Sequence, residues 1–369
     1  MKYIHELSDW PNFQWDMRKL ANLLAETRYK QGRLWGRMSS LGFDVRAEAG
    51  LETLTEDIVK SGGIEGEHLD FTQVRSSLAR RLGIDAGGFP PVPRHVDGVV
   101  DMMLNATRHY ADPLTRERLF GWHALLFPTG YSNGRKIAAA AWRRADIGPM
   151  RVVSGPIGHE KVHFVAPAAD CLEHETAAFL EWFAANDGTD AVIKAGIAHL
   201  WFVTIHPFED GNGRIARAIA DLQLSRADGC AERFFSMSAQ IERDRREYYN
   251  ALERCQRGSL DITAWLEWFL SCLGRAVDGA DIMLAAVLRK GRMWSRANAH
   301  SLNDRQRLVI NRLLDDFAGK LTSGKYAKLA KCSQDTAIRD IKLLLEHRIL
   351  RQGEGAGRNT HYELADDGA

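Results

Sequence analysis

The chain has 369 residues, of which 45% are hydrophobic and 26% are charged, a composition typical of a folded globular protein. Lys and Arg number 49 against 48 Asp and Glu, so a net charge of +1 gives the whole chain no general attraction to nucleic acid or anionic lipid. Five widely spaced cysteines without a C-x-x-C pair argue against a disulfide framework or a thiolate zinc site. No apolar run approaches the roughly 18 residues of a membrane span, and no secretory h-region opens the chain, so we expect a cytoplasmic protein of two or three domains.

The first part of the chain is predicted to be helical. Apolar residues recur at helical spacing over residues 17–41, and a second helix is expected to run through Leu51, Leu54 and Ile58. Prolines and glycines cluster at residues 85–94, and they fit neither a helix interior nor a central strand. We therefore predict an N-terminal helical region over residues 1–94.

The middle of the chain, residues 95–288, is predicted to be a helical domain interrupted by one hairpin. Helical periodicity marks six segments, at residues 96–103, 114–126, 171–185, 190–205, 215–226 and 242–255. Residues 151–165 differ, because Gly and Pro break this stretch and Val162 and Phe164 alternate with histidines. This stretch is expected to form a β-hairpin.

A third unit is predicted at residues 303–369, after a polar stretch at residues 289–304 that is expected to be an exposed linker. Three helices are expected, at residues 305–317, 324–331 and 333–346. A short strand pair is expected around residues 353–358 and 360–364. Three helices followed by a small hairpin are typical of a winged helix.

Two motifs match metal and nucleotide signatures only in their letters. HEKVH at residues 159–163 has the spacing of a zinc protease, but residues four apart in a strand are about 13 Å apart, too far to share one zinc ion. GKLTSGK at residues 319–325 resembles a P-loop, but Tyr326 stands where Ser or Thr would reach Mg²⁺. We expect a strand and a turn there, respectively.

The strongest chemical signal is the run HPFEDGNGRIAR at residues 206–217, between two predicted helices. Gly211 and Gly213 permit a left-handed backbone and close approach, so amides at the start of the second helix can cradle an anion. Arg214 and Arg217 share a helix face and can bind further phosphate oxygens. The spacing therefore predicts a polyphosphate site.

Two further residues of the run suggest what happens to that phosphate chain. Asp210 offers a hard oxygen ligand for a Mg²⁺ ion that bridges phosphates. His206 precedes the cradle, and an imidazole is suited to take a proton from a hydroxyl that attacks phosphorus. His206 is therefore the candidate general base.

The run resembles the signature H-P-F-x-[DE]-G-N-G-R-x-x-R of the Fic family, and every specified position is matched. The resemblance implies a protein adenylyltransferase, which binds ATP and Mg²⁺ and transfers AMP to a Ser, Thr or Tyr hydroxyl of a protein with release of pyrophosphate. The fold class it implies is mainly α: a Fic helical fold with a β-hairpin flap, an N-terminal helical region and a C-terminal winged helix-turn-helix.

The resemblance also implies a role for each matched residue. These roles are His206 as base, Asp210 as Mg²⁺ ligand, Gly211, Asn212 and Gly213 as anion hole with Asn212 on the α-phosphate, Arg214 and Arg217 on the β- and γ-phosphates, and Phe208 in the core. The hairpin would be the flap that adds a strand to the target protein, through Val152, Val153, Val162, His163 and Phe164. Tyr248, Tyr249 and Asn250 could line the adenine pocket, although helix packing explains the tyrosines equally well.

Upstream of this site, SGGIEG at residues 61–66 matches the family's inhibitory pattern [ST]-x-x-x-E-[GN]. In relatives this glutamate pairs with the second motif arginine, so Glu65 is expected to pair with Arg217, with Ser61 and Gly66 completing the pattern. Gly62 and Gly63 each cost a helix about 1 kcal/mol relative to Ala. We therefore expect autoinhibition by a loosely held turn.

The near-neutral total conceals a basic C-terminal unit. Residues 317–361 carry nine Lys and Arg against four Asp and Glu. Arg339 and Lys342 on the third helix, with Arg358 in the wing, could contact DNA phosphates, whereas Asp335 and Asp340 on the same helix would repel them.

Several alternatives therefore stay open. The main one is a DNA-binding regulator whose Fic domain only senses ATP, although an intact His206 and Asp210 favour an enzyme. Within the enzyme class, removal of AMP and other nucleotide donors are open, because Glu65 could position a water molecule and the motif says little about the base. The expected partners are ATP and a protein hydroxyl, including one of its own; a homodimer is open, and no membrane partner is expected.

Overall fold

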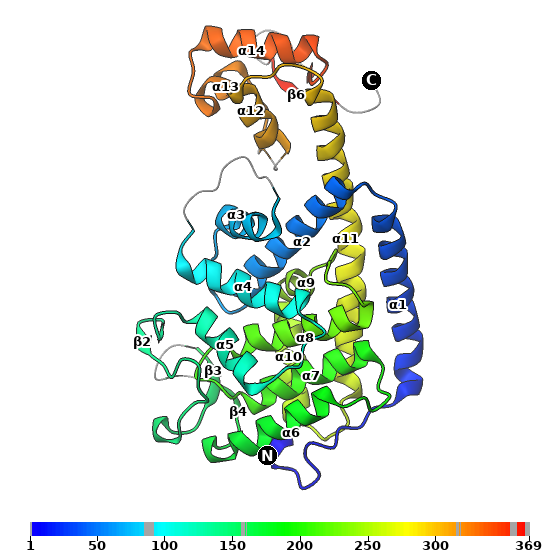
Figure 1. Cartoon of the computed structure of the whole chain (residues 1–369), viewed down its shortest axis with the longest axis vertical. Coiled ribbons are helices and arrows are strands. Elements are labelled where there is room, and N and C mark those ends of the chain that lie inside the picture. Colours follow the sequence, from blue (N-terminus) through cyan, green and yellow to red (C-terminus); the bar gives the residue numbers. More distant parts are fainter. Residues whose placement is uncertain are drawn as a thin grey trace. The chain divides into compact units, whose positions relative to one another are not determined.

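The structure is a computed structural model that describes residues 2–84, 92–155, 159, 161–314, 317, 319–354 and 360–365. The chain divides into two compact units, Met1–Met283 and Leu284–Ala369. The division falls within helix α11 (Thr263–Asn298). Helices dominate both units and the strands are few and short, so the mainly α fold class is confirmed (Figure 1).

The N-terminal region contains α1 (Met17–Ser39), α2 (Phe43–Ile64) and α3 (Phe71–Leu82), after a 3-10 turn, η1 (Ile4–Glu6). Side chains of Asp16 and Asp70 accept hydrogen bonds from the first turns of α1 and α3 and so cap these helices. The first two helices were predicted. Helix α3 was not, because Ser76 and Ser77 lie at buried positions and interrupt its apolar stripe.

In the described part of the first unit seven helices follow, and each of the six predicted segments overlaps at least one of them. They are α4 (Arg94–Arg108), α5 (Arg116–Leu126), α6 (Leu172–Ala184), α7 (Ala191–Ile205), α8 (Asn212–Asp228), α9 (Met237–Arg243) and α10 (Arg245–Gln256). Every residue of α7 after Ala191 is buried, and α7 packs along α8 at the centre of this unit (Figure 1). The segment predicted as one helix at residues 242–255 is divided between α9 and α10 at Asp244.

Two hairpins lie between α5 and α6. The first pairs β1 (Tyr131–Ser132) with β2 (Arg135–Lys136). The second is the predicted hairpin, in which β3 (Arg151–Ser154) pairs antiparallel with β4 (Lys161–Val165) and a bulge follows Val152. The HEKVH segment enters β4 at Lys161, as expected for a strand, and its Glu160 lies outside the described residues.

The second unit contains the end of α11, then α12 (Asp304–Leu314), α13 (Ser323–Leu329) and α14 (Gln334–Glu346), and the antiparallel strands β5 (Leu350–Gln352) and β6 (Tyr362–Leu364). Residues 355–359, which include Arg358 of the predicted wing, lie outside the described residues. The turn predicted at residues 319–325 is present, and Thr322 caps α13 there. The winged-helix assignment stays a prediction.

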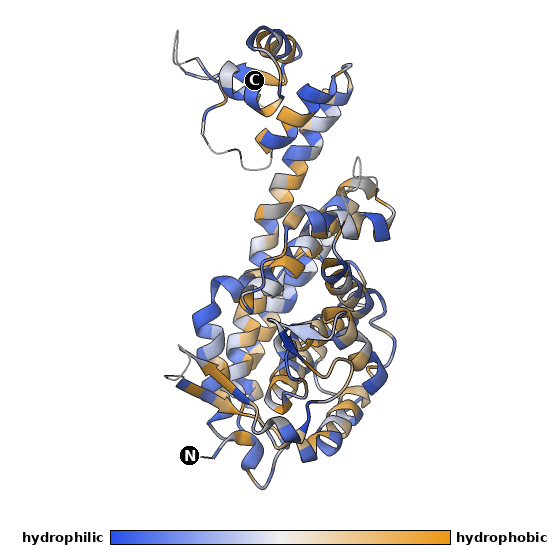
Figure 2. Ribbon diagram, turned by 90° about the vertical axis from the view of Figure 1, so that its left-hand side faces the viewer, coloured by the Kyte–Doolittle hydropathy of each residue, from blue (hydrophilic) through white to orange (hydrophobic). Residues whose placement is uncertain are grey.

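The linker predicted at residues 289–304 is wrong over most of its length, because residues 289–298 belong to α11. Met293 and Ala297 lie in the core of the second unit, one helical turn apart, and charged residues surround them in sequence. A single buried position in each turn gives too weak a periodicity to read as a helix. Figure 2 shows how hydrophilic and hydrophobic residues are interleaved along the helices.

Candidate active site

The candidate site is built on the catalytic loop, residues 206–211, which joins α7 to α8. His206 is the C-cap of α7 in the left-handed conformation (φ 52°), and Gly211 is the N-cap of α8 with φ 81°. A Cβ atom on Gly211 would come within 2.9 Å of the Phe127 ring, so glycine is required there. The first intrahelical bond runs from Ile215 to the Gly211 carbonyl, which leaves the preceding amides of α8 pointing outward as an anion cradle.

The inside of the loop is held by Phe208 and Asn212. Phe208 is fully buried, as expected. Its backbone N–H donates to Asn212 Oδ1 at 2.9 Å, and Asn212 Nδ2 donates to its carbonyl oxygen at 2.8 Å. The side chain of Asn212 therefore braces the loop, and its backbone amide is the part that joins the cradle. The expected contact of Asn212 with the α-phosphate would therefore run through its backbone amide.

Two residues that were not predicted from the sequence form hydrogen bonds with the two ends of the loop. His123 on α5 stacks on Phe208 with ring centroids 4.2 Å apart and contacts the Asp210 carbonyl at 3.2 Å. The backbone N–H of Ala140 donates to His123 Nδ1, so the proton lies on Nε2. Arg143 donates from Nε to the His206 carbonyl at 2.9 Å. Both residues act on backbone atoms, which no side-chain motif reveals.

The imidazole of His206 is held in its neutral form. Its Nδ1 lies 3.2 Å from the Val203 carbonyl, which can only accept, so Nδ1 carries the proton and Nε2 carries the lone pair. Burial is the main cause that lowers the pKa of His206 to about 4, and nearby Glu65 and Asp210 oppose that shift. A neutral imidazole with an available Nε2 can accept a proton near pH 7.

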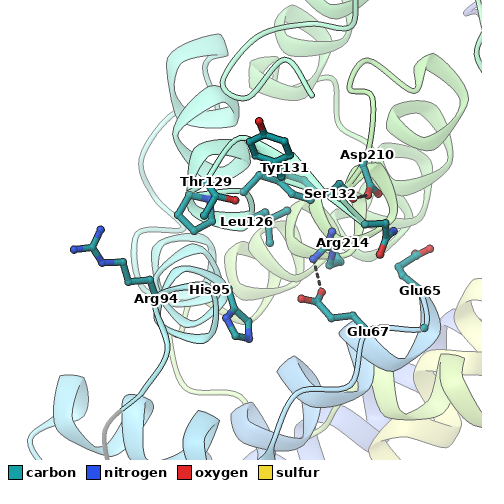
Figure 3. Close-up of a pocket in the computed structure, with 14 residues that line it drawn as sticks. Glu65, Glu67, Arg94, His95, Leu126, Thr129, Tyr131, Ser132, Asp210 and Arg214 are labelled. Carbon is teal, nitrogen blue, oxygen red and sulfur yellow. Dashed lines mark hydrogen bonds and ion pairs between the residues drawn. The ribbon is translucent and has the colours of Figure 1, made fainter. Parts of the chain in front are cut away.

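Asp210 lies at the edge of a cavity of about 510 Å³ that is lined mainly by the end of α5, the first hairpin, the start of α4 and the turn after α2 (Figure 3). Its Oδ1 accepts the Gly211 amide at 2.6 Å, and its Oδ2 accepts from the Ser132 hydroxyl. Arg214, Glu65 and Glu67 also line the cavity. Among the described residues no three His, Cys, Asp or Glu side chains gather as a metal cage, so a cation here would need oxygens from a ligand.

The predicted partners of the second motif arginine are brought together. Arg217, of which 2% of the side chain is exposed, donates from Nη1 to Glu65 Oε1 at 3.0 Å and from Nε to Ser61 Oγ at 2.9 Å. Its Nη2 donates to the Ser61 carbonyl at 3.0 Å. A Cβ atom on Gly213 would lie 2.1 Å from Glu65 Oε1, so the carboxylate rests against the anion cradle itself.

The first motif arginine also has a carboxylate partner, which the sequence analysis missed. Arg214 donates from Nη1 to Glu67 Oε2, and its guanidinium lies over the Phe127 ring at 5.1 Å (Figure 3). Arg214 is 6% exposed. Glu67 follows Glu65 by two residues, just after α2, and this second carboxylate beside the inhibitory pattern was the signal available in the sequence.

The turn that carries both glutamates needs its glycines. Gly66 has φ 81°, and the Glu67 amide donates back to the Gly62 carbonyl at 3.0 Å. A Cβ atom on Gly63 would come within 2.5 Å of Glu242 Oε1. Gly63 therefore permits close packing of the end of α2 against α9, and Gly62 permits the chain to turn back, because a Cβ atom there would lie 3.0 Å from the Glu67 carbonyl oxygen.

The three residues predicted beside adenine lie on α10 in different surroundings. Tyr248 is buried, its hydroxyl lies 2.9 Å from His199 Nε2, and burial raises its pKa. Tyr249 is 37% exposed and donates to the Ile64 carbonyl at 3.3 Å, close to Glu65. Asn250 is exposed. Tyr248 thus fits the helix-packing alternative, whereas Tyr249 and Asn250 stay available to a ligand.

The flap residues also differ from one another. On β3, Val152 is half-buried and Val153 is 46% exposed, so this edge is open to an added strand. On β4, Phe164 is buried against Tyr3 and His5 of the N-terminal segment and cannot face a target.

A side-chain clamp joins β4 to α10. His163 Nδ1 contacts Glu253 Oε2 at 2.7 Å, and its Nε2 contacts Ser154 Oγ at 2.6 Å. Arg257 donates to the carbonyl oxygens of Val162 and His163. These contacts fix β4 and leave β3 as the exposed edge of the hairpin.

Known proteins resemble different parts of the chain. Residues 113–224 match the Fic/DOC family, and residues 3–84 match a domain of unknown function, DUF4172. A protein adenylyltransferase Fic of Nematostella vectensis is 33% identical over 116 residues, 31% of this chain and 25% of that protein. Another, of Culex quinquefasciatus, is 26% identical over 232 residues, 62% of this chain and 41% of that protein. The chain thus spans less than half the length of either relative.

Solved structures share the fold. A Fic family protein from Desulfovibrio desulfuricans superposes with a TM-score of 0.54 at 22% identity, over 95% of this chain and 97% of that one. A Fic-domain signaling protein from Bacteroides thetaiotaomicron gives a TM-score of 0.51 at 18% identity, over 72% and 97% of the two chains. Residues 113–224, which hold the anion cradle, both arginines and His206, therefore form a Fic/DOC family domain.

Proposed function

We propose that the first unit transfers AMP from ATP to a hydroxyl group of a protein. The observation that carries the proposal is the neutral imidazole of His206, which lies one short loop before a helix N-terminus flanked by two buried arginines. Such a nest binds a polyphosphate, and such a base accepts the proton of an attacking hydroxyl. The curated relatives named protein adenylyltransferase support the same reaction.

In this reaction the acceptor oxygen attacks the α-phosphorus and pyrophosphate leaves. The proton of the hydroxyl passes to His206 Nε2, while the amides of α8 hold the α-phosphate. Arg214 and Arg217 hold the charge that develops on the leaving pyrophosphate. The exposed edge of β3 would pair with an extended segment of the target and so align its Ser, Thr or Tyr hydroxyl.

Mg²⁺ fits the donor set beside the cradle. Asp210 supplies a carboxylate at the cavity edge, and one carboxylate plus substrate phosphates is a usual coordination for this ion. When bound, Mg²⁺ would neutralise charge on the phosphate chain. Ser132, which donates to Asp210, would orient the carboxylate.

The contacts of the turn after α2 support autoinhibition. Glu65 pairs with Arg217 and packs against the anion cradle, and Glu67 pairs with Arg214. Both arginines that would hold the outer phosphates are therefore paired with carboxylates of the same turn. We propose that ATP binds productively only when this turn moves away.

The test is incorporation of ³²P into protein from labelled ATP. The Glu65→Gly variant, incubated with a cell lysate, should transfer label from α-labelled ATP and none from γ-labelled ATP. Mass spectrometry should then find AMP on a hydroxyl side chain of a lysate protein or of the enzyme itself. Label from the γ position alone would indicate phosphate transfer instead, and release of AMP from a labelled protein would indicate the reverse reaction.

For the C-terminal unit we propose DNA binding as a second function. Asp340, counted above as repelling phosphate, is 4% exposed and holds Arg305 at 2.9 Å and Asn303 at 3.0 Å. Its charge therefore faces inward and is compensated. Arg339 and Lys342 stay exposed on α14, the helix that would enter the major groove.

A further inference from the structure

Arg143 is buried beside the start of the catalytic loop, with 3% of its surface exposed. Its Nε donates to the carbonyl oxygen of His206 at 2.9 Å, and its Nη2 donates to that of Pro167. Its backbone N–H donates to the Pro207 carbonyl at 2.9 Å. One residue thus joins the beginning of the loop to the segment that follows flap strand β4.

This arginine differs from the other buried arginines of the first unit in its partners. Arg214, Arg217 and Arg233 each pair with a carboxylate. Within the described part of the chain, Arg143 pairs with none, and burial lowers its pKa. An unpaired buried cation is costly, so backbone carbonyls alone have to stabilise it. The planar guanidinium suits this task because it donates to two carbonyls at fixed angles, which an ammonium group cannot reproduce.

The carbonyl that Arg143 holds belongs to a strained residue. His206 has φ 52° and ψ 57°, a conformation that non-glycine residues adopt at a cost. Its backbone N–H donates to the Phe202 carbonyl at 3.0 Å, and its Nδ1 is tied to the Val203 carbonyl. Because Arg143 holds the carbonyl from the other side, both the backbone and the ring of His206 are restrained by hydrogen bonds.

We infer that Arg143 is a positioning residue for His206, whose guanidinium locks the His206 backbone and so fixes where the imidazole presents Nε2. The inference rests on the proposed AMP transfer for its catalytic consequence. The positioning itself can be measured on the protein without any transfer reaction.

The positive charge of Arg143 supports the same role, because it favours the neutral form of the His206 imidazole. Among the described residues, the charged groups that act on the His206 imidazole include Arg143 from the segment after β2, Glu65 from the end of α2, and Asp210 from the catalytic loop. Arg143 disfavours the imidazolium, and the two carboxylates favour it. Arg143 thus helps to keep the base neutral as well as oriented.

The experiment compares three variants of the full chain in the Glu65→Gly background. Arg143→Met removes the charge and the donors, and Arg143→Lys keeps the charge but loses the two-carbonyl fork. Arg144→Met is the matched control, because Arg144 is exposed and pairs only with Asp146 among the described residues. NMR titration of ¹³C-labelled histidines, with His206 assigned through its own substitution, reports the imidazole, and kinetics report kcat and KM for ATP.

We expect Arg143→Met to raise the pKa of His206 and to lower kcat by about 100-fold, since small misplacements of a catalytic group have effects of this size. The KM for ATP should not change, because Arg143 contacts His206 and is not among the residues proposed to bind the phosphates. Arg143→Lys should keep the low pKa and recover only part of kcat, and Arg144→Met should match its parent. A folded Arg143→Met protein, by circular dichroism, with the parent's titration and kcat would overturn the inference. If the parent transfers no AMP at all, the proposed function fails and the titration still decides the role of Arg143.

Discussion

Glu65 Oε1 lies 3.0 Å from Arg217 Nη1 and 2.1 Å from where a Cβ atom on Gly213 would stand, so one carboxylate covers both the second motif arginine and the start of α8. A triphosphate bound to the cradle would meet this carboxylate as a like charge. In the proposed autoinhibition, Glu65 would therefore compete with the phosphates sterically and electrostatically for the same place, and removing the carboxylate should release the inhibition.

We predict that Glu65→Gly raises the rate of AMP transfer or self-modification by about tenfold, the effect of one charge-assisted hydrogen bond discounted for the partial exposure of Glu65. Incorporation from α-³²P-labelled ATP measures it. Asp112→Gly is a suitable control, because Asp112 is an acidic residue in an exposed loop. Equal incorporation by the wild type and Glu65→Gly would remove Glu65 from its inhibitory role.

Glu67 should contribute independently, because it holds the other arginine. Glu67→Gln keeps the size of the side chain and removes the charge from the Arg214 pair. We predict that ATP binds about fivefold more tightly, as expected for an ion pair whose carboxylate is one-third exposed. Isothermal titration with ATP and Mg²⁺ measures the affinity, and the double variant with Glu65→Gly should exceed either single change. An unchanged affinity in both backgrounds would mean that the Glu67 contact does not oppose the nucleotide.

His206→Ala should abolish transfer and leave nucleotide binding intact. Loss of a general base typically lowers a rate by 10²- to 10⁴-fold. In the proposed binding mode the phosphates contact α8 and not the imidazole, so the affinity for ATP should stay close to that of the parent. Transfer assays and titration on the same Glu65→Gly protein separate the two effects, and transfer that persists would assign the base to another residue.

The packing of α4 on α5 offers a stability test with a matched pair of glycines. A Cβ atom on Gly98 of α4 would lie 2.0 Å from the Leu125 carbonyl oxygen, whereas one on Gly121 of α5 would meet nothing within 4 Å. We predict that Gly98→Ala lowers the free energy of unfolding by about 1–3 kcal/mol or more through overpacking. Gly121→Ala should raise it by about 0.5–1 kcal/mol, because alanine favours the helix. Urea unfolding of both proteins compares them, and a harmless Gly98→Ala would contradict the close approach.

The residues of the candidate site could be selected from the sequence because they are concentrated in two short runs. The run at residues 206–217 and the pattern at residues 61–66 each place their residues within a few positions, and folding brings Glu65 to Arg217 across 152 positions. The hairpin was also predictable, since a period of two and the breaking glycines act locally.

The residues that hold the site in place were not readable in the same way. Arg143 is 63 positions from His206 and, within the residues that the structure describes, bonds only to backbone carbonyls, and His123 is 87 positions from Asp210. Backbone acceptors carry no residue identity, so no spacing in the sequence marks their donors. The family resemblance could name the groups that touch the substrate, but their supports emerge only from the fold.

The last prediction concerns DNA and the exposed face of α14. If Arg339 and Lys342 contact phosphates, changing both to Glu should abolish binding of the full chain to duplex DNA, and Arg312→Glu on α12 is the matched control for a lost positive charge. Each phosphate contact adds about 0.9 to the slope of log affinity against log salt, so a gel shift at several salt concentrations counts the contacts. Because Asp340 is buried against Arg305, Asp340→Asn should lower the stability of the packing between α12 and α14 and should have little effect on the affinity for DNA. Binding that does not depend on salt concentration and that survives the charge reversal would assign this unit to a protein partner instead.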